Sequence, residues 1–401
     1  MSGGFKALKI TDRVYWVGAI DWGLRNFHGY LTSRGTTYNA FLVLDDKITL
    51  IDTVKPQFYP EMMGRISSVI NPKEISYVVS NHSEMDHSGA LPRFVHAMKP
   101  EKIVASANGV KALKAHFHWD THVETVKSGD VLNLGNTQLK FVEARMLHWP
   151  DSMFSYLDEE GVLFSNDAFG MHLATSERFA DEIDFSILQA EGAKYFANIL
   201  LHLSPLVLRL IDQLPSLNLD IKMIAPDHGP VWRENVGTIV DLYGKWARQE
   251  KTHRAIVVYD SMWGSTSRMA RAVGDGLKEG GAAVTLMPLD SAHRSDVVTE
   301  LLDAGALVVG SPTMNNQIYP TVADVVNYLK GLKPKNLVGA TFGSFGWSGE
   351  AVKHLDNHMR EMGVDLVEDG LRIPYVPDDE ALAGCRNLGL KVANTLLDSI
   401  K

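Results

Sequence analysis

Cysteine is almost absent from this sequence. Its 401 residues include a single cysteine, Cys385. One thiol excludes an internal disulfide, and it also excludes a four-thiolate zinc, rubredoxin-type or iron–sulfur site within one chain. Any metal that one chain binds must therefore rest on histidine, aspartate and glutamate.

A long hydrophobic run and an excess of positive charge are missing as well. No apolar run approaches the roughly 20 residues that cross a bilayer, and residues 1–16 lack the apolar core of a signal peptide. Lys and Arg number 39 against 48 Asp and Glu, a formal net charge of −9, and no basic tract offsets it. These absences argue against membrane and nucleic-acid partners, so we expect a cytoplasmic protein.

The length and the apolar pattern predict two domains. A chain of 401 residues is too long for one ordinary core. The charged segment 247–253 separates two different patterns. We therefore expect one domain at residues 1–250 and a second at residues 251–401.

The first domain is predicted to be an α/β sandwich. Three segments place polar turn residues between alternating apolar positions, which predicts hairpins at 37–52, 131–144 and 153–167. Helical patterns lie at about 59–70, 89–98, 108–116 and 184–213. Together they predict two mostly antiparallel sheets with helices on the outside.

The second domain has a different pattern. Apolar strand segments at 254–259, 283–289, 306–310 and 337–343 each precede a helical pattern. Strands that alternate with helices predict a doubly wound parallel sheet. About 150 residues with five strands fit a flavodoxin-like domain.

Four candidate metal ligands stand close together after a predicted strand. In SYVVSNHSEMDHSGALP, residues 76–92, a short apolar run precedes His82, Glu84, Asp86 and His87. The spacing alone is weak evidence, because a carboxylate such as Asp86 also caps helices.

Three more candidates repeat this arrangement. His148 in MLHWPDS, Asp167 in LFSNDAFG and His228 in MIAPDHGP each follow an apolar strand in a turn-rich loop. Taken alone, His148 fits a structural histidine equally well. If the two sheets pack face to face, these strand ends meet at one edge, and all seven side chains form a metal site with nitrogen and oxygen ligands.

A histidine-rich segment between these motifs invites a second metal site. His116, His118 and His122 lie in KAHFHWDTH. Residues two apart point to different sides of a helix. We therefore expect these histidines to be solvated or to cap a helix.

Three loops of the second domain follow predicted strands. The first, DSMWGSTSRMA, is rich in hydroxyls and leads into a helix, an arrangement that binds phosphate without lysine. It matches neither the Walker loop nor the dinucleotide glycine pattern, which favours a mononucleotide. Loops at the carboxyl ends of neighbouring strands hold FMN in flavodoxin-like sheets. The candidate FMN residues are Ser261, Met262, Trp263, Gly264, Ser265, Thr266, Ser311, Pro312, Thr313, Asn315, Asn316, Ser344, Phe345, Gly346, Trp347 and Gly349.

Together, the seven candidate ligands and the three loops resemble the flavodiiron proteins, or A-type flavoproteins. The resemblance covers nearly the whole chain. It implies a metallo-β-lactamase-like αββα sandwich followed by a flavodoxin-like sheet of five parallel strands. It assigns one iron to His82, Glu84 and His148 and the other to Asp86, His87 and His228, with Asp167 bridging. It also implies that His28 and Tyr195 line the substrate pocket without binding metal.

The resemblance further implies a reaction and its partners. The expected function is reduction of dioxygen to water, of nitric oxide to nitrous oxide, or of both, with electrons passing through FMN. The expected donor is rubredoxin as a separate protein, since no paired cysteines follow the flavodoxin segment, with reduced F420 as the alternative. A head-to-tail homodimer, or a dimer of such dimers, is expected to bring one chain's FMN to the other chain's irons.

Two other functions compete with this one. A zinc hydrolase of the same fold would use the flavodoxin half for regulation, but such hydrolases have histidine where this chain has Glu84, a harder donor that suits iron. A plain electron-transfer flavoprotein would carry a vestigial metal domain. Vestigial sites usually lose ligands, and here all seven positions are filled.

Overall fold

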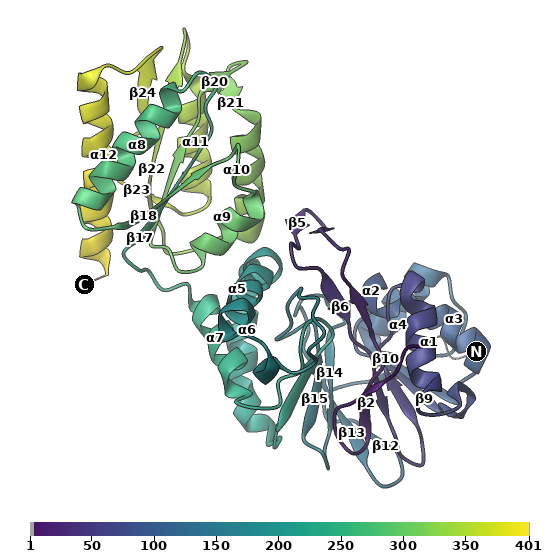
Figure 1. Ribbon diagram of the computed structural model, residues 1–401. Helices are drawn as coiled ribbons and strands as arrows, with labels where there is room; N and C mark the ends of the chain where they lie inside the picture. Colours follow the sequence, from purple (N-terminus) through teal and green to yellow (C-terminus); the bar gives the residue numbers. More distant parts are fainter. Residues whose placement is uncertain (1–3, 401) are drawn as a thin grey trace. The chain divides into compact units, whose positions relative to one another are not determined.

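The computed structural model describes residues 4–400, which fold into two compact units (Figure 1). Among the described residues, one unit comprises residues 4–195 and 205–244, and the other comprises residues 196–204 and 245–400. The division predicted at residues 250 and 251 placed Phe196–Ser204 in the first half. In the structure the Asn198 side chain donates a hydrogen bond to the Ser295 carbonyl (3.2 Å) and accepts one from the Tyr328 hydroxyl (2.9 Å). These bonds tie the segment to the second unit.

Two sheets form the centre of the first unit. The larger has the order β1-β2-β7-β8-β9-β10-β11, and the smaller has the order β12-β13-β14-β15-β16. The strands of the larger sheet are β1 (Leu8–Lys9), β2 (Val14–Trp16), β7 (Phe41–Val43), β8 (Thr49–Ile51), β9 (Tyr77–Ser80), β10 (Lys102–Ser106) and β11 (Glu124–Val126). Those of the smaller sheet are β12 (Val131–Asn133), β13 (Gln138–Glu143), β14 (Met153–Leu157), β15 (Val162–Asn166) and β16 (Met223–Pro226). Two short ribbons pair β3 (Ala19–Asp21) with β6 (Thr36–Tyr38), and β4 (Asn26–Phe27) with β5 (Tyr30–Leu31).

All three predicted hairpins are present. The antiparallel pairs are β7 with β8, β12 with β13, and β14 with β15. The larger sheet is less antiparallel than predicted, because β8, β9, β10 and β11 pair in parallel. Helices connect these strands, and such crossovers produce parallel neighbours.

Apolar side chains fill two layers of this unit. Phe41 and Val79 of the larger sheet join Phe141 and Phe164 of the smaller sheet in a core between the sheets. The opposite face of the larger sheet packs against helices through residues such as Phe94. The helices of this unit are α1 (Tyr59–Ser67), α2 (Met85–Ser88), α3 (Leu91–Met98), α4 (Ala107–Phe117), α5 (Phe185–Tyr195), α6 (Ser204–Gln213) and α7 (Gly237–Arg248). These layers confirm the predicted αββα sandwich.

The helix predicted over 184–213 is interrupted. A π-helical turn (Phe196–Leu200) and a 3-10 turn (Leu201–Leu203) separate α5 from α6. Pro205 lacks the N–H that would continue a regular helix, and the Asn198 bonds described above hold the turn. Among the described residues, Phe185–Leu217 is the one helical run long and apolar enough to cross a membrane. More than half of its most apolar window is buried inside the protein, as in a core helix.

The second unit is a doubly wound parallel sheet with the order β18-β17-β19-β22-β23, with β24 also pairing β22. Its strands are β17 (Arg254–Tyr259), β18 (Ala283–Pro288), β19 (Ala306–Gly310), β22 (Val338–Phe345), β23 (Asp365–Leu366) and β24 (Leu371–Pro374). This is the flavodoxin order, and two short strands share the fifth position, where one was predicted. The helices are α8 (Ser265–Glu279), α9 (Arg294–Leu301), α10 (Pro320–Leu332), α11 (Glu350–Glu361) and α12 (Asp379–Ser399), and a short ribbon pairs β20 (Thr313–Met314) with β21 (Gln317–Ile318).

Candidate metal and flavin sites

The ends of four strands bring the seven candidate ligands together in the first unit. Asp167 and His228 follow β15 and β16, which are parallel neighbours. The motif after β9 is joined to the other sheet by Asn81, whose carbonyl accepts a hydrogen bond from the Met153 N–H (3.0 Å). The predicted loop holding Asp86 and His87 is instead the short helix α2, and the next helix, α3, begins at Leu91.

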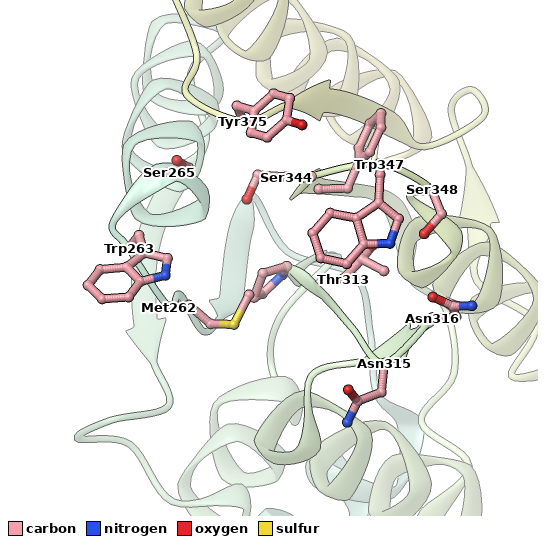
Figure 2. Close-up of a pocket in the computed structure, with 13 residues that line it drawn as sticks. Met262, Trp263, Ser265, Thr313, Asn315, Asn316, Ser344, Trp347, Ser348 and Tyr375 are labelled. Atoms are coloured by element: carbon pink, nitrogen blue, oxygen red, sulfur yellow. The ribbon is translucent and has the colours of Figure 1, made fainter.

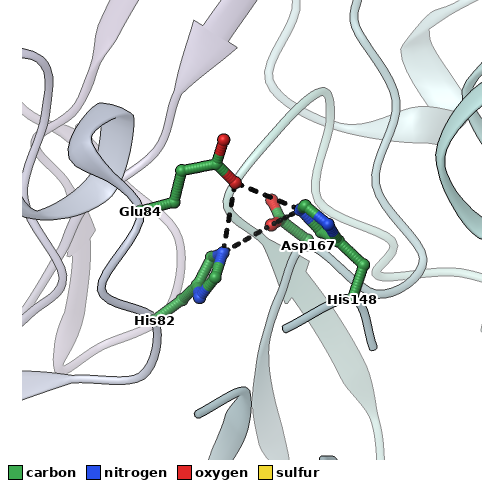
Figure 3. A group of neighbouring side chains, drawn as sticks. All are labelled: His82, Glu84, His148 and Asp167. Atoms are coloured by element: carbon green, nitrogen blue, oxygen red, sulfur yellow. Dashed lines mark hydrogen bonds and ion pairs between the residues drawn. The ribbon is translucent and has the colours of Figure 1, made fainter. Parts of the chain in front are cut away.

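One group of ligand atoms forms around Glu84 and Asp167 (Figure 3). His82 Nε2 lies 3.3 Å from Glu84 Oε2 and 3.4 Å from Asp167 Oδ2. His148 Nε2 lies 3.2 Å from each of the same two oxygens. Atoms that share a metal at about 2.1 Å stand roughly 3.0–3.4 Å apart, so these spacings fit one ion.

A second group lies on the other side of Asp167. His87 Nε2 is 3.2 Å and His228 Nε2 is 3.4 Å from Asp167 Oδ1. The same nitrogens are 3.4 and 3.3 Å from Asp86 Oδ1 and Oδ2. The two oxygens of Asp167 therefore face two different histidine pairs, as a bridging carboxylate would.

Buried oxygens without hydrogen bonds show that this site fits metal ions. Neither oxygen of Asp86 or of Asp167 has a hydrogen-bond partner among the described residues, and both side chains are almost fully buried. Histidine nitrogens at 3.2–3.4 Å offset the charge of these carboxylates, but burying a carboxylate that accepts no hydrogen bond is costly. Two cations between the histidine pairs would satisfy all four oxygens.

The far nitrogens of three of the histidines lie close to a further set of groups. His82 Nδ1 is 3.2 Å from Asp151 Oδ2, which also accepts hydrogen bonds from the Ser83 N–H (2.7 Å) and hydroxyl (2.6 Å). His228 Nδ1 donates to the Thr37 carbonyl (2.6 Å), and His87 Nδ1 lies 3.5 Å from an Asp227 oxygen. Such contacts leave Nε2 free to ligate a metal.

Carboxylates control the protonation of these histidines. Burial lowers the pKa of His82, but hydrogen bonds to Asp151 and Glu84 outweigh it and raise that pKa to about 10. Burial also lowers the pKa of His148, but hydrogen bonds to Asp167 and Glu84 outweigh this effect and raise that pKa to about 9. Burial alone would raise the pKa of Asp167, and the surrounding histidines lower it well below its usual value. Without metal, the site is therefore a cluster of protonated histidines paired with ionised carboxylates.

Loading the metal-free protein with iron is expected to release protons. Ligation needs neutral imidazole, whereas at pH 7 the metal-free His82 and His148 are protonated. The apparent metal affinity should therefore rise with pH until it passes these two pKa values, and weaken as pH falls. Calorimetry at one pH in buffers of different protonation enthalpy measures the protons released. Metal uptake without proton release would contradict the ion pairing described above.

A cavity of about 610 Å³ opens over the metal cluster. Its lining includes Glu84, Asp86, His28, Lys55 and Trp149. The predicted pocket residue His28 lies in the turn between β4 and β5, and its Nε2 is 3.2 Å from Glu84 Oε1.

The other predicted pocket residue, Tyr195, is buried beside the cluster. Its ring lies 5.1 Å from the ring of His172 and 6.2 Å from that of His228. Both distances are within the range of aromatic contacts. The structure therefore places Tyr195 next to the site, while its role stays a prediction.

Sequence reasoning missed several supporting residues. Thr36 Oγ1 lies 2.9 Å from His172 Nδ1 and 3.2 Å from His228 Nδ1. Asp151 and Asp227 stand within three residues of predicted ligands, and that proximity was an available signal. Neither Thr36 nor His172 follows the pattern of an apolar strand ending in a ligand.

The second unit has a pocket of about 380 Å³ at the strand ends (Figure 2). Most predicted FMN residues line it, namely Met262, Trp263, Ser265, Pro312, Thr313, Asn315, Asn316, Ser344, Phe345, Gly346 and Trp347. Trp263 and Trp347 are 93% and 88% exposed and stand on either side of the pocket, where two rings are free to contact a flat ligand. The Ser261 hydroxyl is buried without a hydrogen-bond partner among the described residues, which fits a phosphate at the start of α8.

The remaining predicted loop residues are not part of this lining. They are Ser261, Gly264, Thr266, Ser311 and Gly349. The Ser311 hydroxyl is turned inward, where it accepts a hydrogen bond from the Tyr319 N–H (2.9 Å), and Thr266 meets Ser344 at 3.0 Å. Ser348 and Tyr375 line the pocket and were not predicted.

Comparisons with known proteins cover both units. Residues 36–229 match the model of the "ODP family beta lactamase", and residues 257–389 match that of "Flavodoxin". A nitric oxide reductase of Moorella thermoacetica is 45% identical over 97% of this chain and 98% of its own length. A rubredoxin-oxygen oxidoreductase of Megalodesulfovibrio gigas is 44% identical, covering 98% of each chain. The crystal structure of the flavodiiron protein from Giardia intestinalis, 34% identical, superposes with a TM-score of 0.94 and covers 98% of each chain.

Proposed function

The chain belongs to the flavodiiron proteins, and from this premise we propose that it reduces dioxygen to water, nitric oxide to nitrous oxide, or both, at two irons supplied with electrons through FMN. The observation that carries the proposal is the position of Asp167. One of its oxygens faces His82 and His148, and the other faces His87 and His228. A carboxylate placed between two histidine pairs suits two metal ions.

The proposed iron ligands are the seven clustered side chains. His82, Glu84 and His148 hold one iron, Asp86, His87 and His228 hold the other, and Asp167 bridges them. Three carboxylates among four histidines supply negative charge that offsets the charge of the cations. Glu84 is the oxygen donor that separates this set from a zinc hydrolase, and it favours iron.

The flavin pocket of the second unit is proposed to hold FMN. Ser265 is the first residue of α8 and Ser261 lies in the loop before it, where helix N–H groups would bind the phosphate. The loops at 312–316 and 344–348 line the pocket and would hold the ring system, with Trp347 available to contact it. Bound FMN and the two irons together supply the electrons of the reaction, while the protein orients them and controls access.

The electron count supports this pairing of sites. Reduction of O₂ to two H₂O takes four electrons and four protons, and reduction of two NO to N₂O and H₂O takes two of each. Two irons that change by one electron each, together with a two-electron flavin, hold the four electrons. Neither site alone holds that number.

The proposed donor is a separate rubredoxin, with reduced F420 as the alternative. The proposed assembly is a head-to-tail homodimer in which the FMN of one chain serves the irons of the other. Exposed apolar side chains at both sites support an interface there. Trp263, Trp347 and Tyr375 surround the flavin pocket, and Met85 lies at the rim of the metal cavity.

Assays of gas consumption, with the protein and donor prepared anaerobically, test the proposed function. Protein loaded with iron and FMN, and supplied with reduced rubredoxin, is expected to consume O₂, NO or both, as followed with O₂ and NO electrodes. A metal-free sample is the control and should consume neither gas. If the fully loaded protein consumes neither, while the donor does reduce its flavin, the proposal is wrong.

A further inference from the structure

His116 is an imidazole in the metal cavity that the ligand set does not use. It lies in the last turn of α4 and lines the cavity of about 610 Å³ together with Glu84 and Asp86. The sequence predicted that His116 is solvated or caps a helix. The structure fits this for His118, which ends α4 in the left-handed conformation, and it adds that the partly exposed His116 lines the cavity.

In the described part of the chain, the ring of His116 is held in place without a hydrogen bond to its buried nitrogen. Its Nδ1 is buried and has no hydrogen-bond partner among the described residues. Its ring is held by edge contacts with Trp149 and Phe117, each at 6.0 Å between ring centres. The residue as a whole is only partly buried. A side chain that reaches both solvent and the cavity is able to exchange protons with each.

The other titratable groups of the cavity are already engaged. Glu84 and Asp86 are candidate ligands whose neighbouring histidines outweigh burial and lower both pKa values, so they remain ionised. His28 Nε2 is paired with Glu84 at 3.2 Å. The Lys55 ammonium lies over the rings of Tyr38 (4.7 Å) and Phe27 (5.4 Å).

The face of α4 next to His116 carries no competing charge. The residues one turn earlier are Ala112 and Leu113, and neither titrates. Trp149 stands between His116 and the metal cluster, with its ring 5.1 Å from that of His82. His116 is therefore close to the cluster without touching a candidate ligand.

We propose that His116 delivers protons from solvent to the substrate cavity during reduction of the diatomic gas. This inference rests on the proposed function. Every electron pair that reaches O₂ or NO is matched by two protons from solvent, and the ligand histidines are unsuited to carry them, because their Nε2 atoms face the metal positions. Imidazole is the side chain best suited to exchange protons near neutral pH. The imidazole of His116 gives a proton to the oxygen being reduced and then takes up another proton from water.

Substitution with a matched control tests this role. His116→Ala is expected to lower the turnover rate by about tenfold or more, with unchanged iron and FMN content. Imidazole added to the buffer should restore the rate in a saturable way. His118→Ala is the control, because His118 is exposed at the same helix end and does not line the cavity. It should keep the wild-type rate and show no response to imidazole.

A second readout does not depend on turnover. Diethyl pyrocarbonate should modify His116 in the metal-free protein, as mapped by mass spectrometry, because the side chain lines the cavity and is only partly buried. A wild-type rate in His116→Ala, a lowered rate that imidazole does not restore, or an unreactive His116 would each overturn the inference. If instead the loaded wild-type protein consumes neither gas, the proposed function fails, and with it the role of His116.

Discussion

An Asp167→Asn variant is expected to lose both metal ions and to fall in activity by more than about 100-fold, because removal of even an outer partner of a metal ligand costs 10–100-fold. Asp167 is the one side chain whose oxygens face both histidine pairs, at 3.2–3.4 Å. An amide carries no charge and presents only one oxygen. The variant therefore offers a bridging acceptor to neither ion.

The control for this variant is Asp158→Asn. Asp158 follows β14 in the same sheet, and its partly exposed carboxylate pairs with Lys140 at 2.7 Å, away from the cluster. Elemental analysis and gas consumption should match wild type for the control. FMN content should be unchanged in both variants, because the flavin pocket belongs to the other unit. Two irons per chain in Asp167→Asn would contradict the bridging role.

A mixed dimer of two inactive variants is expected to recover activity. Asp167→Asn keeps its flavin, whereas Ser265→Asp keeps its metal site and loses FMN, since the new carboxylate repels the phosphate. An acidic residue in the first turn of α8 is otherwise compatible with the helix. In a head-to-tail pair, the flavin of the first variant faces the irons of the second. One of the two pairs of sites is then complete, so the dimer should work at about half the wild-type rate.

Two different affinity tags isolate this mixed dimer. Each variant purified alone is the control and should be inactive. If electrons passed only within one chain, the doubly tagged dimer would also be inactive, because neither chain holds both a flavin and irons. The same result would follow if the chains did not form a head-to-tail pair.

The sequence predicted the parts of the site that local pattern determines. The three hairpins and the parallel sheet follow from apolar alternation and from the turn residues between strands. His148, Asp167 and His228 were predicted because each follows an apolar strand, and strand ends meet at one edge of packed sheets. The structure brings all seven candidates within reach of two metal ions.

The missed features depend on contacts between distant segments. Asp151 and His82 are 69 residues apart, and Thr36 and His228 are 192 residues apart. No local pattern reports such pairs. Asp86 and His87 belong to a helical turn too short to produce a period, and Asn198 holds a π-helical turn through bonds to Ser295 and Tyr328. His116 was expected to be solvated or to cap a helix, because its spacing does not show the cavity beside it.

The most direct test of a diiron oxidoreductase is the metal content of the purified chain. Protein produced with ample iron is expected to contain about two irons per chain by elemental analysis, since the donor set of imidazoles and carboxylates around Glu84 suits iron. Asp158→Asn should give the same value, and Asp167→Asn should give close to none. Zinc in place of iron, persisting when iron is abundant, would contradict the account and favour a hydrolase of the same fold.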